Sequence, residues 1–411
     1  MKFSKSVIKF NIKNISVIGN FENGGLIGLT EDGRRLCEKI DTGEISEEQA
    51  MNENKELFLA MKEMNFFETN EEKHRLFSTY LHVTQRCNLN CLGCYSYDCN
   101  RNKLQDPDIC GVQHAIDELA AEGLQVLIIS GGEPFLRNDL KDIVKYAKDK
   151  GIPAIQIITN GTVLKEEVLV EIKPYVMSVA VSFDGYSKEN PTFIRNEGIF
   201  DKLINSVELL KKLGINTTIL PTIHSKNYCN LQDYVELSRK LEVGISFSLL
   251  TCSPYDEVFK DYIPKSNQLD LLGKELTVLG QEGVSVNDMP INSSIDVRRS
   301  CEVGTKIISI GADGSVYPCH MLHDEKLIMG NVFKQSLSEI MQSKIAKELQ
   351  QLHVDQFEIC NECEHRYLCG GGCRARSYYK NQNFISHDYY CAMTKVFFED
   401  VSTMLNQQYS S

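Results

Sequence analysis

Hydrophobic and polar positions follow two alternating patterns through the middle of the chain. Short apolar runs recur at residues 80–85, 126–130, 154–160, 176–184, 216–223 and 244–250. Between these runs, apolar residues return every three or four positions, and the stretches that contain them end at Gly123, Gly151 and Gly214. The runs predict six strands, and the intervening stretches predict amphipathic helices that stop at glycine.

This alternation of strands and helices indicates the fold class. Repeated βα units place their strands in a parallel sheet, and six of them suit a partial (βα)6 TIM-like barrel. A barrel of this kind has its functional site at the carboxyl ends of the strands. We therefore expect an α/β protein with the barrel at residues 76–290.

The two ends of the chain follow other patterns. Apolar residues alternate at residues 7–12 and 15–18, and a turn and helical stretches follow, one of them starting at a capping box of Ser46 and Gln49. Residues 1–75 thus predict a winged-helix-like domain whose last eight residues are a polar linker. From about residue 292 cysteines, glycines and turns dominate, which predicts a small metal-stabilised domain at residues 291–411.

Composition narrows the class of protein. The 411 residues are 42% hydrophobic and 24% charged, as in ordinary globular proteins, with no apolar stretch of signal-peptide or membrane-spanning length. We expect a cytoplasmic protein without a membrane partner. The net charge of -12 disfavours nucleic acid as a partner. In a reducing compartment, fifteen cysteines indicate metal ligands better than disulfides.

Three cysteines follow the first predicted strand of the barrel. Cys87, Cys91 and Cys94 lie in the sequence CNLNCLGC, at the end of the barrel where the site is expected. One short loop with three thiolates can hold a 4Fe-4S cluster and leave its fourth iron open for chemistry. A structural zinc half-site is the alternative interpretation of this spacing.

The loop and the neighbouring strand ends resemble the radical S-adenosylmethionine (radical SAM) superfamily over roughly residues 80–250. The resemblance implies that S-adenosylmethionine chelates the open iron and is cleaved to a 5′-deoxyadenosyl radical. It also implies cofactor contacts of three kinds. The methionyl ammonium meets Gly131, Gly132, Glu133 and Pro134, the ribose meets Ser182 and Asp184, and the methionyl carboxylate meets Arg195.

One position departs from the pattern of that family. The residue before the third cysteine is usually aromatic and lies beside the adenine, but here it is Gly93. We expect Tyr95 to take over this packing.

A second set of seven cysteines resembles in full the SPASM domain of peptide-modifying radical SAM enzymes. That domain carries two auxiliary 4Fe-4S clusters, which would bring the total to three. The resemblance implies a distal cluster on Cys360, Cys363, Cys369 and Cys391, and a proximal cluster on Cys301, Cys319 and Cys373. A zinc site on the residues from Cys360 to Cys373 is the alternative.

The proximal set is one cysteine short of a closed cluster. Relatives with a closed proximal cluster have a further cysteine a few residues upstream, whereas residues 292–300 contain none. We expect an open iron there, or Cys252 as the fourth ligand. An open iron suits the binding of a substrate thiolate, because coordination deprotonates a thiol and holds it in place.

His320 and the amino-terminal domain bear on the substrate. Tyr317-Pro-Cys-His320 resembles the corresponding sequence of enzymes that make thioether crosslinks in cysteine-rich peptides. His320 is a candidate proton carrier, or it hydrogen-bonds a cluster sulfur.

The amino-terminal domain resembles the RiPP recognition element, which binds the leader of a ribosomally made precursor peptide as an added strand. DNA binding is the alternative for a winged helix.

These observations predict a radical SAM enzyme that modifies a ribosomally made precursor peptide and forms cysteine thioethers. Its expected electron donor is of the flavodoxin or ferredoxin type. The alternatives are a carbon–carbon or carbon–oxygen crosslinker, a peptide epimerase, a sulfatase-maturase-like enzyme and, from another class, a non-catalytic metal-binding protein.

Overall fold

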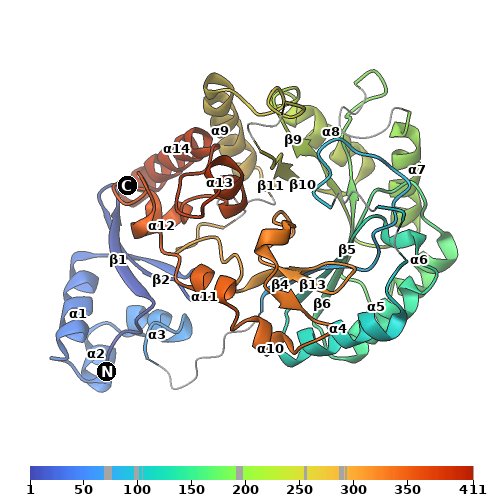
Figure 1. The fold of residues 1–411 in the computed structure, drawn as a ribbon. Coiled ribbons are helices and arrows are strands. Elements are labelled where there is room, and N and C mark those ends of the chain that lie inside the picture. Colours follow the sequence, from blue (N-terminus) through green and yellow to red (C-terminus); the bar gives the residue numbers. More distant parts are fainter. Residues whose placement is uncertain are drawn as a thin grey trace.

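The chain forms three parts that pack on one another, with the barrel on one side of Figure 1 and the amino-terminal domain on the other. The computed structural model describes residues 1–68, 76–96, 101–103, 105–190, 198–253, 257–286, 291 and 294–410. Across these residues, no helix combines the length and the apolar character needed to cross a membrane.

The amino-terminal part is a small sheet followed by helices. Its antiparallel sheet has the order β1 (Val7–Ile12), β2 (Ile15–Asn20) and β3 (Leu26–Leu29). Three helices follow: α1 (Glu31–Thr42), α2 (Glu47–Glu53) and α3 (Lys55–Glu63). Helix α2 begins at the predicted capping box, so the hairpin and this helix start are confirmed. The winged-helix assignment stays a prediction, and the linker lies outside the described residues beyond residue 68.

Strand β2 is buried on both of its faces. On one face, Ile18 packs in a core with apolar residues of α1 and α3. On the other face, Ile15 and Val17 join a core with helices α9 (Ser266–Gln281) and α14 (Cys391–Ser410). Because alternate strand residues point to opposite faces, one strand serves both cores. The amino-terminal domain is thereby fixed to the carboxyl-terminal helix.

The barrel confirms all six predicted strands, with the fifth split into two. Neighbouring strands are parallel and run in the order β4, β5, β6, β7, β8, β10, while β9 pairs with β10. Gly123, Gly151 and Gly214 follow their helices with φ of 71°, 84° and 66°, which confirms the predicted stops. The strands are β4 (Ser78–His82), β5 (Val126–Ser130), β6 (Ala154–Thr159), β7 (Ser178–Ser182), β8 (Thr217–Leu220), β9 (Thr222–Ile223), β10 (Gly244–Leu249) and β11 (Ser285–Val286).

Helices and short 3-10 turns connect these strands. The first barrel helices, α4 to α6, cover one side of the sheet in Figure 1. The connecting elements are α4 (Ile109–Ala121), η1 (Pro134–Leu136), α5 (Leu140–Asp149), α6 (Glu166–Ile172), α7 (Phe200–Lys212) and α8 (Leu231–Leu241).

The auxiliary domain continues the barrel sheet beyond β4, which the sequence pattern did not predict. Strand β12 (Ile307–Ile310) pairs in parallel with β4, and β13 (Ser315–Tyr317) and β14 (Gly330–Asn331) follow. This pairing carries the segment after β13 to the mouth of the barrel. The remaining elements are η2 (Glu325–Leu327), α10 (Leu337–Ile340), α11 (Lys344–Gln350), η3 (Val354–Gln356), α12 (Arg366–Cys369) and α13 (Arg374–Asn381).

Candidate metal centres

The three cysteines that follow β4 line one cavity at the carboxyl ends of the strands. Several of the predicted site residues lie in the same lining, and His320 and Met321 reach it from the auxiliary domain. The predicted residues that the cavity brings together are Cys87, Cys91, Gly93, Cys94, Tyr95, Gly131, Gly132, Ser182 and His320. The geometry therefore agrees with a three-thiolate site that faces a ligand cavity.

The two glycines after β5 hold the cysteine loop by direct backbone contact. The Gly132 N–H donates to the Thr84 carbonyl at 2.8 Å, and the Glu133 N–H donates to the Arg86 carbonyl at 2.8 Å. A Cβ atom on Gly132 would lie 2.1 Å from the Arg86 carbonyl oxygen. A side chain at this position would thus push the cysteine loop away from β5.

Glu133 is fully buried and joins the ends of β5 and β6. Its carboxylate accepts hydrogen bonds from the Thr159 hydroxyl at 2.8 Å and from the Asn160 N–H at 2.7 Å. Pro134 is also buried, at the start of η1. The cavity lining includes Gly131 and Gly132 but neither Glu133 nor Pro134. Their predicted contact with a methionyl ammonium stays a prediction.

The predicted ribose-binding residues lie at the end of β7. Ser182 is the last residue of that strand and lines the cavity. Asp184 is buried, and its backbone carbonyl accepts a hydrogen bond from the Tyr234 hydroxyl of α8. Arg195, predicted to meet the methionyl carboxylate, lies outside the described residues.

Sequence reasoning missed a buried cation beside the cysteine loop. The Arg101 guanidinium lies 3.3 Å from the Cys94 sulfur and donates to the carbonyl and the hydroxyl of Ser96. Burial is the largest single influence and raises the pKa of Cys94, but the Arg101 charge and the hydrogen bonds from Arg101 and Ser96 together outweigh it, so the net pKa shift is downward. Arg101 stands in a polar stretch without strand or helix periodicity, so no sequence signal indicated it.

Three aromatic rings border this cavity on the side of the auxiliary domain. The His320 ring stacks on Tyr80 with centroids 3.7 Å apart, and the Tyr95 ring meets it edge-on at 5.4 Å. The His320 Nδ1 atom lies 3.5 Å from the Cys319 sulfur. Burial and the neighbouring His323 lower the pKa of His320 to about 3, so the ring is neutral at neutral pH. This contact favours a hydrogen bond to the sulfur, and the proton-carrier role stays a prediction.

The four predicted distal ligands line a second cavity. Cys360, Cys363, Cys369 and Cys391 share its lining. Burial raises the pKa of Cys360 and Cys369 and raises that of Cys391 to about 11. Cys360 is buried and the other three are partly buried, so four thiolates here need a compensating cation, and the iron of a 4Fe-4S cluster fits this donor set.

Each of the three predicted proximal ligands lies near a residue of α13. Cys373 immediately precedes this helix, and the Arg374 backbone N–H donates to the Cys301 thiol. Cys319 and Cys373 both lie close enough to Tyr379 for their charges to raise its pKa, although burial is the larger cause. Cys252 is buried, and its backbone N–H and carbonyl bond to the Tyr389 hydroxyl. Its role as a fourth ligand stays a prediction.

Comparison with known families supports the division into barrel and auxiliary domain. Residues 81–238 match the model of the radical SAM superfamily, and residues 301–364 match the model of the SPASM iron–sulfur cluster-binding domain.

Two characterised relatives have different named activities. An AdoMet-dependent heme synthase of Methanosarcina barkeri is 27% identical over 338 residues, which cover 75% of this chain and 94% of the relative. The antilisterial bacteriocin subtilosin biosynthesis protein AlbA of Bacillus subtilis is 26% identical over 311 residues, which cover 74% and 68% of the two chains.

Two solved structures share the fold. The enzyme anSMEcpe, solved with bound AdoMet and the Kp18Cys peptide, matches with a TM-score of 0.67 and 22% identity over 80% of this chain and 98% of its own. SuiB of Streptococcus suis, solved with its precursor peptide SuiA, matches with a TM-score of 0.64 and 15% identity over 95% and 99% of the two chains. Residues 81–238, with the cysteine loop at the barrel mouth, thus form a radical SAM domain, and residues 301–364 form a SPASM domain.

Proposed function

We propose that this chain is a radical SAM enzyme that modifies a ribosomally made precursor peptide and closes sulfur-to-carbon thioether bonds in it. The observation that carries the peptide assignment is the small β-sheet domain that precedes the barrel. Similarity to the SuiB structure with its precursor peptide covers 95% of this chain, whereas similarity to the heme synthase covers 75%.

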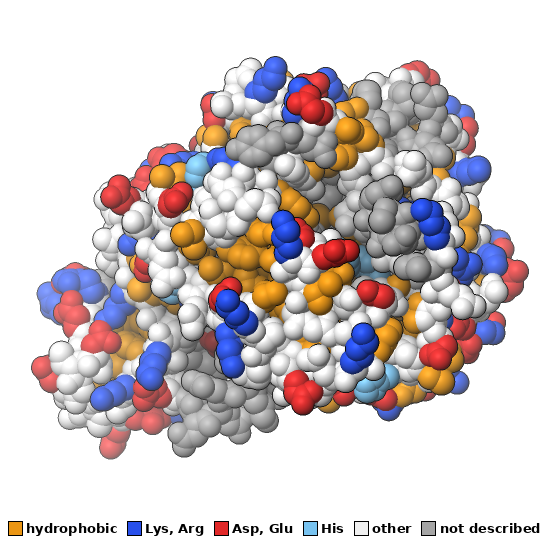
Figure 2. Space-filling model, in the orientation of Figure 1, with side chains coloured by type: hydrophobic (Ala, Val, Ile, Leu, Met, Phe, Trp, Pro, Cys, Tyr) orange, Lys and Arg blue, Asp and Glu red, His pale blue; other side chains and the backbone are white. Residues whose placement is uncertain are grey.

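The amino-terminal sheet offers an edge for a peptide strand. Of the strands that the structure describes, β3 pairs with β2 alone, so its outer backbone groups are free for strand addition. Residues 1–75 carry 11 Lys and Arg against 14 Asp and Glu. Figure 2 shows charges of both signs scattered over the face in view rather than one basic patch. These features favour a peptide leader over DNA as the ligand.

The barrel cavity would hold the radical chemistry. When bound at Cys87, Cys91 and Cys94, a 4Fe-4S cluster with S-adenosylmethionine supplies a 5′-deoxyadenosyl radical, which abstracts hydrogen from the acceptor residue. Ser182 and Tyr95 line the space for the cosubstrate. The stacked Tyr80 and His320 rings line the cavity on the side of the auxiliary domain.

The thioether assignment rests on the proximal cysteines. The proximal set consists of Cys301, Cys319 and Cys373, and each lies near a residue of α13. Three ligands would leave one iron of the proximal cluster for a substrate thiolate. His320 lies between Cys319 and the barrel cavity, so a thiolate held there would face the radical site. An external donor of the flavodoxin or ferredoxin type would supply the electrons.

Mass spectrometry of a co-produced precursor tests this proposal. The short reading frames beside the gene are searched for a cysteine-rich peptide, and such a peptide is the substrate to use. A thioether removes two hydrogens per bond and blocks alkylation of one thiol. Loss of two hydrogens with all thiols still alkylated would instead indicate a carbon–carbon or carbon–oxygen crosslink. Unchanged hydrogen count with deuterium uptake from heavy water would indicate epimerisation.

A tetrapyrrole modification is the second candidate, because the Methanosarcina barkeri relative is named a heme synthase. A porphyrin substrate would bind in or near the barrel cavity and shift its Soret absorption. Our proposal predicts no such shift with iron porphyrins and a measurable affinity for the leader peptide.

A further inference from the structure

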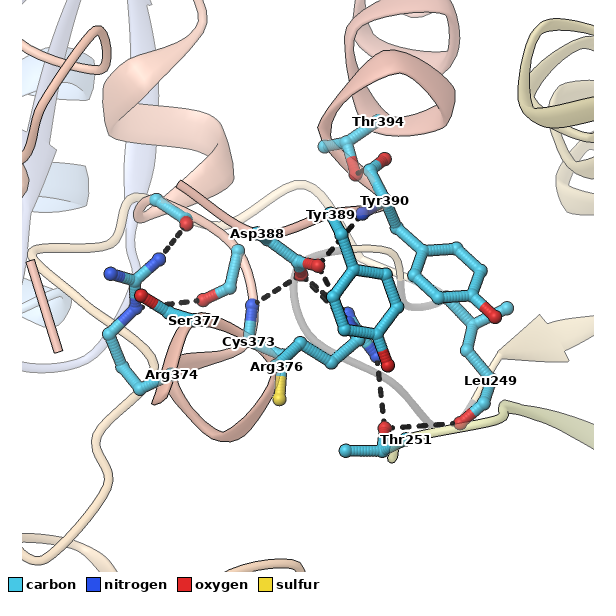
Figure 3. A network of polar contacts seen from close by, with 12 residues as sticks. Leu249, Thr251, Cys373, Arg374, Arg376, Ser377, Asp388, Tyr389, Tyr390 and Thr394 are labelled. Carbon is cyan, nitrogen blue, oxygen red and sulfur yellow. Dashed lines mark hydrogen bonds and ion pairs between the residues drawn. The ribbon is translucent and has the colours of Figure 1, made fainter. Parts of the chain in front are cut away.

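Two fully buried arginines stand at the start of α13, directly after Cys373. The Arg374 and Arg376 side chains both have 0% exposure. The Arg376 guanidinium forms an ion pair with Asp388 at 2.8 Å, and Asp388 also accepts from the Cys373 N–H (Figure 3). Arg376 therefore has an acidic partner inside the protein.

Arg374 differs from Arg376 in the kind of partner it has. Its Nη1 donates to the carbonyls of Phe384 at 2.6 Å and Ser386 at 3.0 Å, and its other nitrogens donate to carbonyls of the preceding glycines. Its guanidinium also stacks on the Phe357 ring at 4.2 Å. Among the residues that the structure describes, no carboxylate forms an ion pair with it.

This set of partners leaves the charge of Arg374 without a counter-ion. Carbonyl oxygens satisfy the guanidinium donors, but they carry no net charge. A buried ion is costly unless it is paired with an opposite charge or a metal centre. An anionic group is therefore expected next to Arg374 in the complete protein.

The cysteines of both auxiliary sites lie within electrostatic reach of Arg374. On the proximal side, Arg374 directly follows the predicted ligand Cys373. On the distal side, its guanidinium donates to the carbonyls of Gly371 and Gly372, and both glycines line the cavity of the distal cysteines. Arg374 thus stands between the two sets of ligands.

We propose that Arg374 is the shared counter-ion of the two auxiliary iron–sulfur clusters and raises the reduction potential of both. The inference rests on the cluster assignment of the proposed function. A thiolate-ligated cluster is anionic and becomes more so on reduction, so a fixed cation beside it favours the reduced state. Arg374 acts as a positioning and tuning residue and does not contact substrate.

The test measures the auxiliary clusters alone. In the full chain with Cys87, Cys91 and Cys94 replaced by alanine, redox titrations followed by electron paramagnetic resonance report only the auxiliary clusters. Arg374→Met is expected to lower both reduction potentials by at least about 59 mV. For a one-electron reduction, this shift is a tenfold change in the equilibrium constant. Arg374→Lys keeps the charge and is expected to keep most of the potential.

Arg137→Met is the matched control. Arg137 is also buried, but it pairs with Asp139 and donates to the Val83 carbonyl, on the barrel side of the molecule. Its loss is expected to reduce stability without moving the auxiliary potentials. The proposal is overturned if Arg374→Met shifts the potentials no more than Arg137→Met does, or if only one cluster responds.

Thermal unfolding covers the case in which Arg374→Met assembles its clusters poorly. The melting temperature of the reconstituted protein is expected to fall more than that of the metal-free protein, because the charge is compensated only when clusters are bound. Equal losses would mean that Arg374 is merely structural. If the wild-type protein holds no iron and sulfide in its auxiliary domain, the cluster assignment itself is wrong. If Arg374→Met has normal clusters with unchanged potentials, only the role of Arg374 is wrong.

Discussion

The barrel site and the auxiliary domain differ in what holds their cysteines in place. The barrel loop is fixed by hydrogen bonds from the Gly132 and Glu133 backbone N–H groups after β5, next to a large apolar core. Of the distal cysteines, Cys360 and Cys363 lie outside helices and strands, Cys369 ends the four-residue helix α12, and Cys391 begins the long helix α14. A site supported by a large core is formed before metal binds, whereas a domain with few elements depends on its metal for stability.

The pKa shifts of the cysteines also differ between the two regions. At the barrel loop Arg101 lowers the pKa of Cys94 against the effect of burial. At the distal site burial prevails and raises the pKa of Cys360 and Cys391. The pKa of Cys94 is thus shifted toward the thiolate, although burial raises that of Cys87 in the same loop, whereas the shifts at Cys360 and Cys391 favour the thiol until a metal binds.

The largest expected effect is the loss of the auxiliary domain on removing one distal ligand. Cys369→Ala is expected to lose auxiliary iron and to expose the region after residue 350 to proteases. Cys91→Ala is expected to lose about a third of the iron and sulfide and to keep its fold, since the core supports the loop. Metal analysis with limited proteolysis measures both variants. Equal protease resistance of the two would contradict the difference drawn here.

The next effect concerns the buried ion pair beside Cys373. Asp388→Asn leaves Arg376 without its carboxylate and is expected to cost about 3–5 kcal/mol of unfolding free energy in the reconstituted protein. The control is Asp355→Asn, which breaks the partly exposed pair with Arg366 and is expected to cost at most about 1 kcal/mol. Urea denaturation compares the two, and similar losses would show that the Asp388 pair is not specially important.

A smaller effect is expected at the buried carboxylate of the barrel. Glu133→Gln weakens the charge-assisted hydrogen bonds from Thr159 and Asn160 and is expected to cost about 1.5–3 kcal/mol. If Glu133 serves only to join β5 and β6, the folded variant keeps its affinity for S-adenosylmethionine. Weaker binding with unchanged stability would instead restore the predicted contact with the methionyl ammonium.

The sequence predicted the strands of the barrel, but not the buried arginines beside the cysteine sites. The run at residues 126–130 has a single polar residue because all but the first residue of this strand are buried, so it stands out in one dimension. The pairing of β12 with β4 was missed, since a four-residue strand gains its identity from a partner more than 200 residues away. Spacing indicated the cysteine sets, but the roles of Arg101 and Arg374 depend on contacts that only the fold creates.

The last expected effect is a pH dependence of barrel stability, which is absent at neutral pH and grows as the pH falls. Burial lowers the pKa of His224 to about 4, so below pH 6.5 the unfolded chain takes up a proton that the folded chain does not. The unfolding free energy is expected to fall by about 1.4 kcal/mol per pH unit between pH 6.5 and pH 4 through this residue. His224→Gln is expected to flatten this slope, and denaturant titrations at several pH values measure it. An unchanged slope in the variant would contradict the assignment.

The most direct test of the central claim is the release of 5′-deoxyadenosine by the anaerobically reconstituted full chain, given S-adenosylmethionine and dithionite. The account predicts release by the wild type and by Arg137→Met, and none by Cys91→Ala. A wild type that releases no deoxyadenosine, or a Cys91→Ala variant that releases as much, would contradict the assignment of the barrel cysteines to a radical-forming centre.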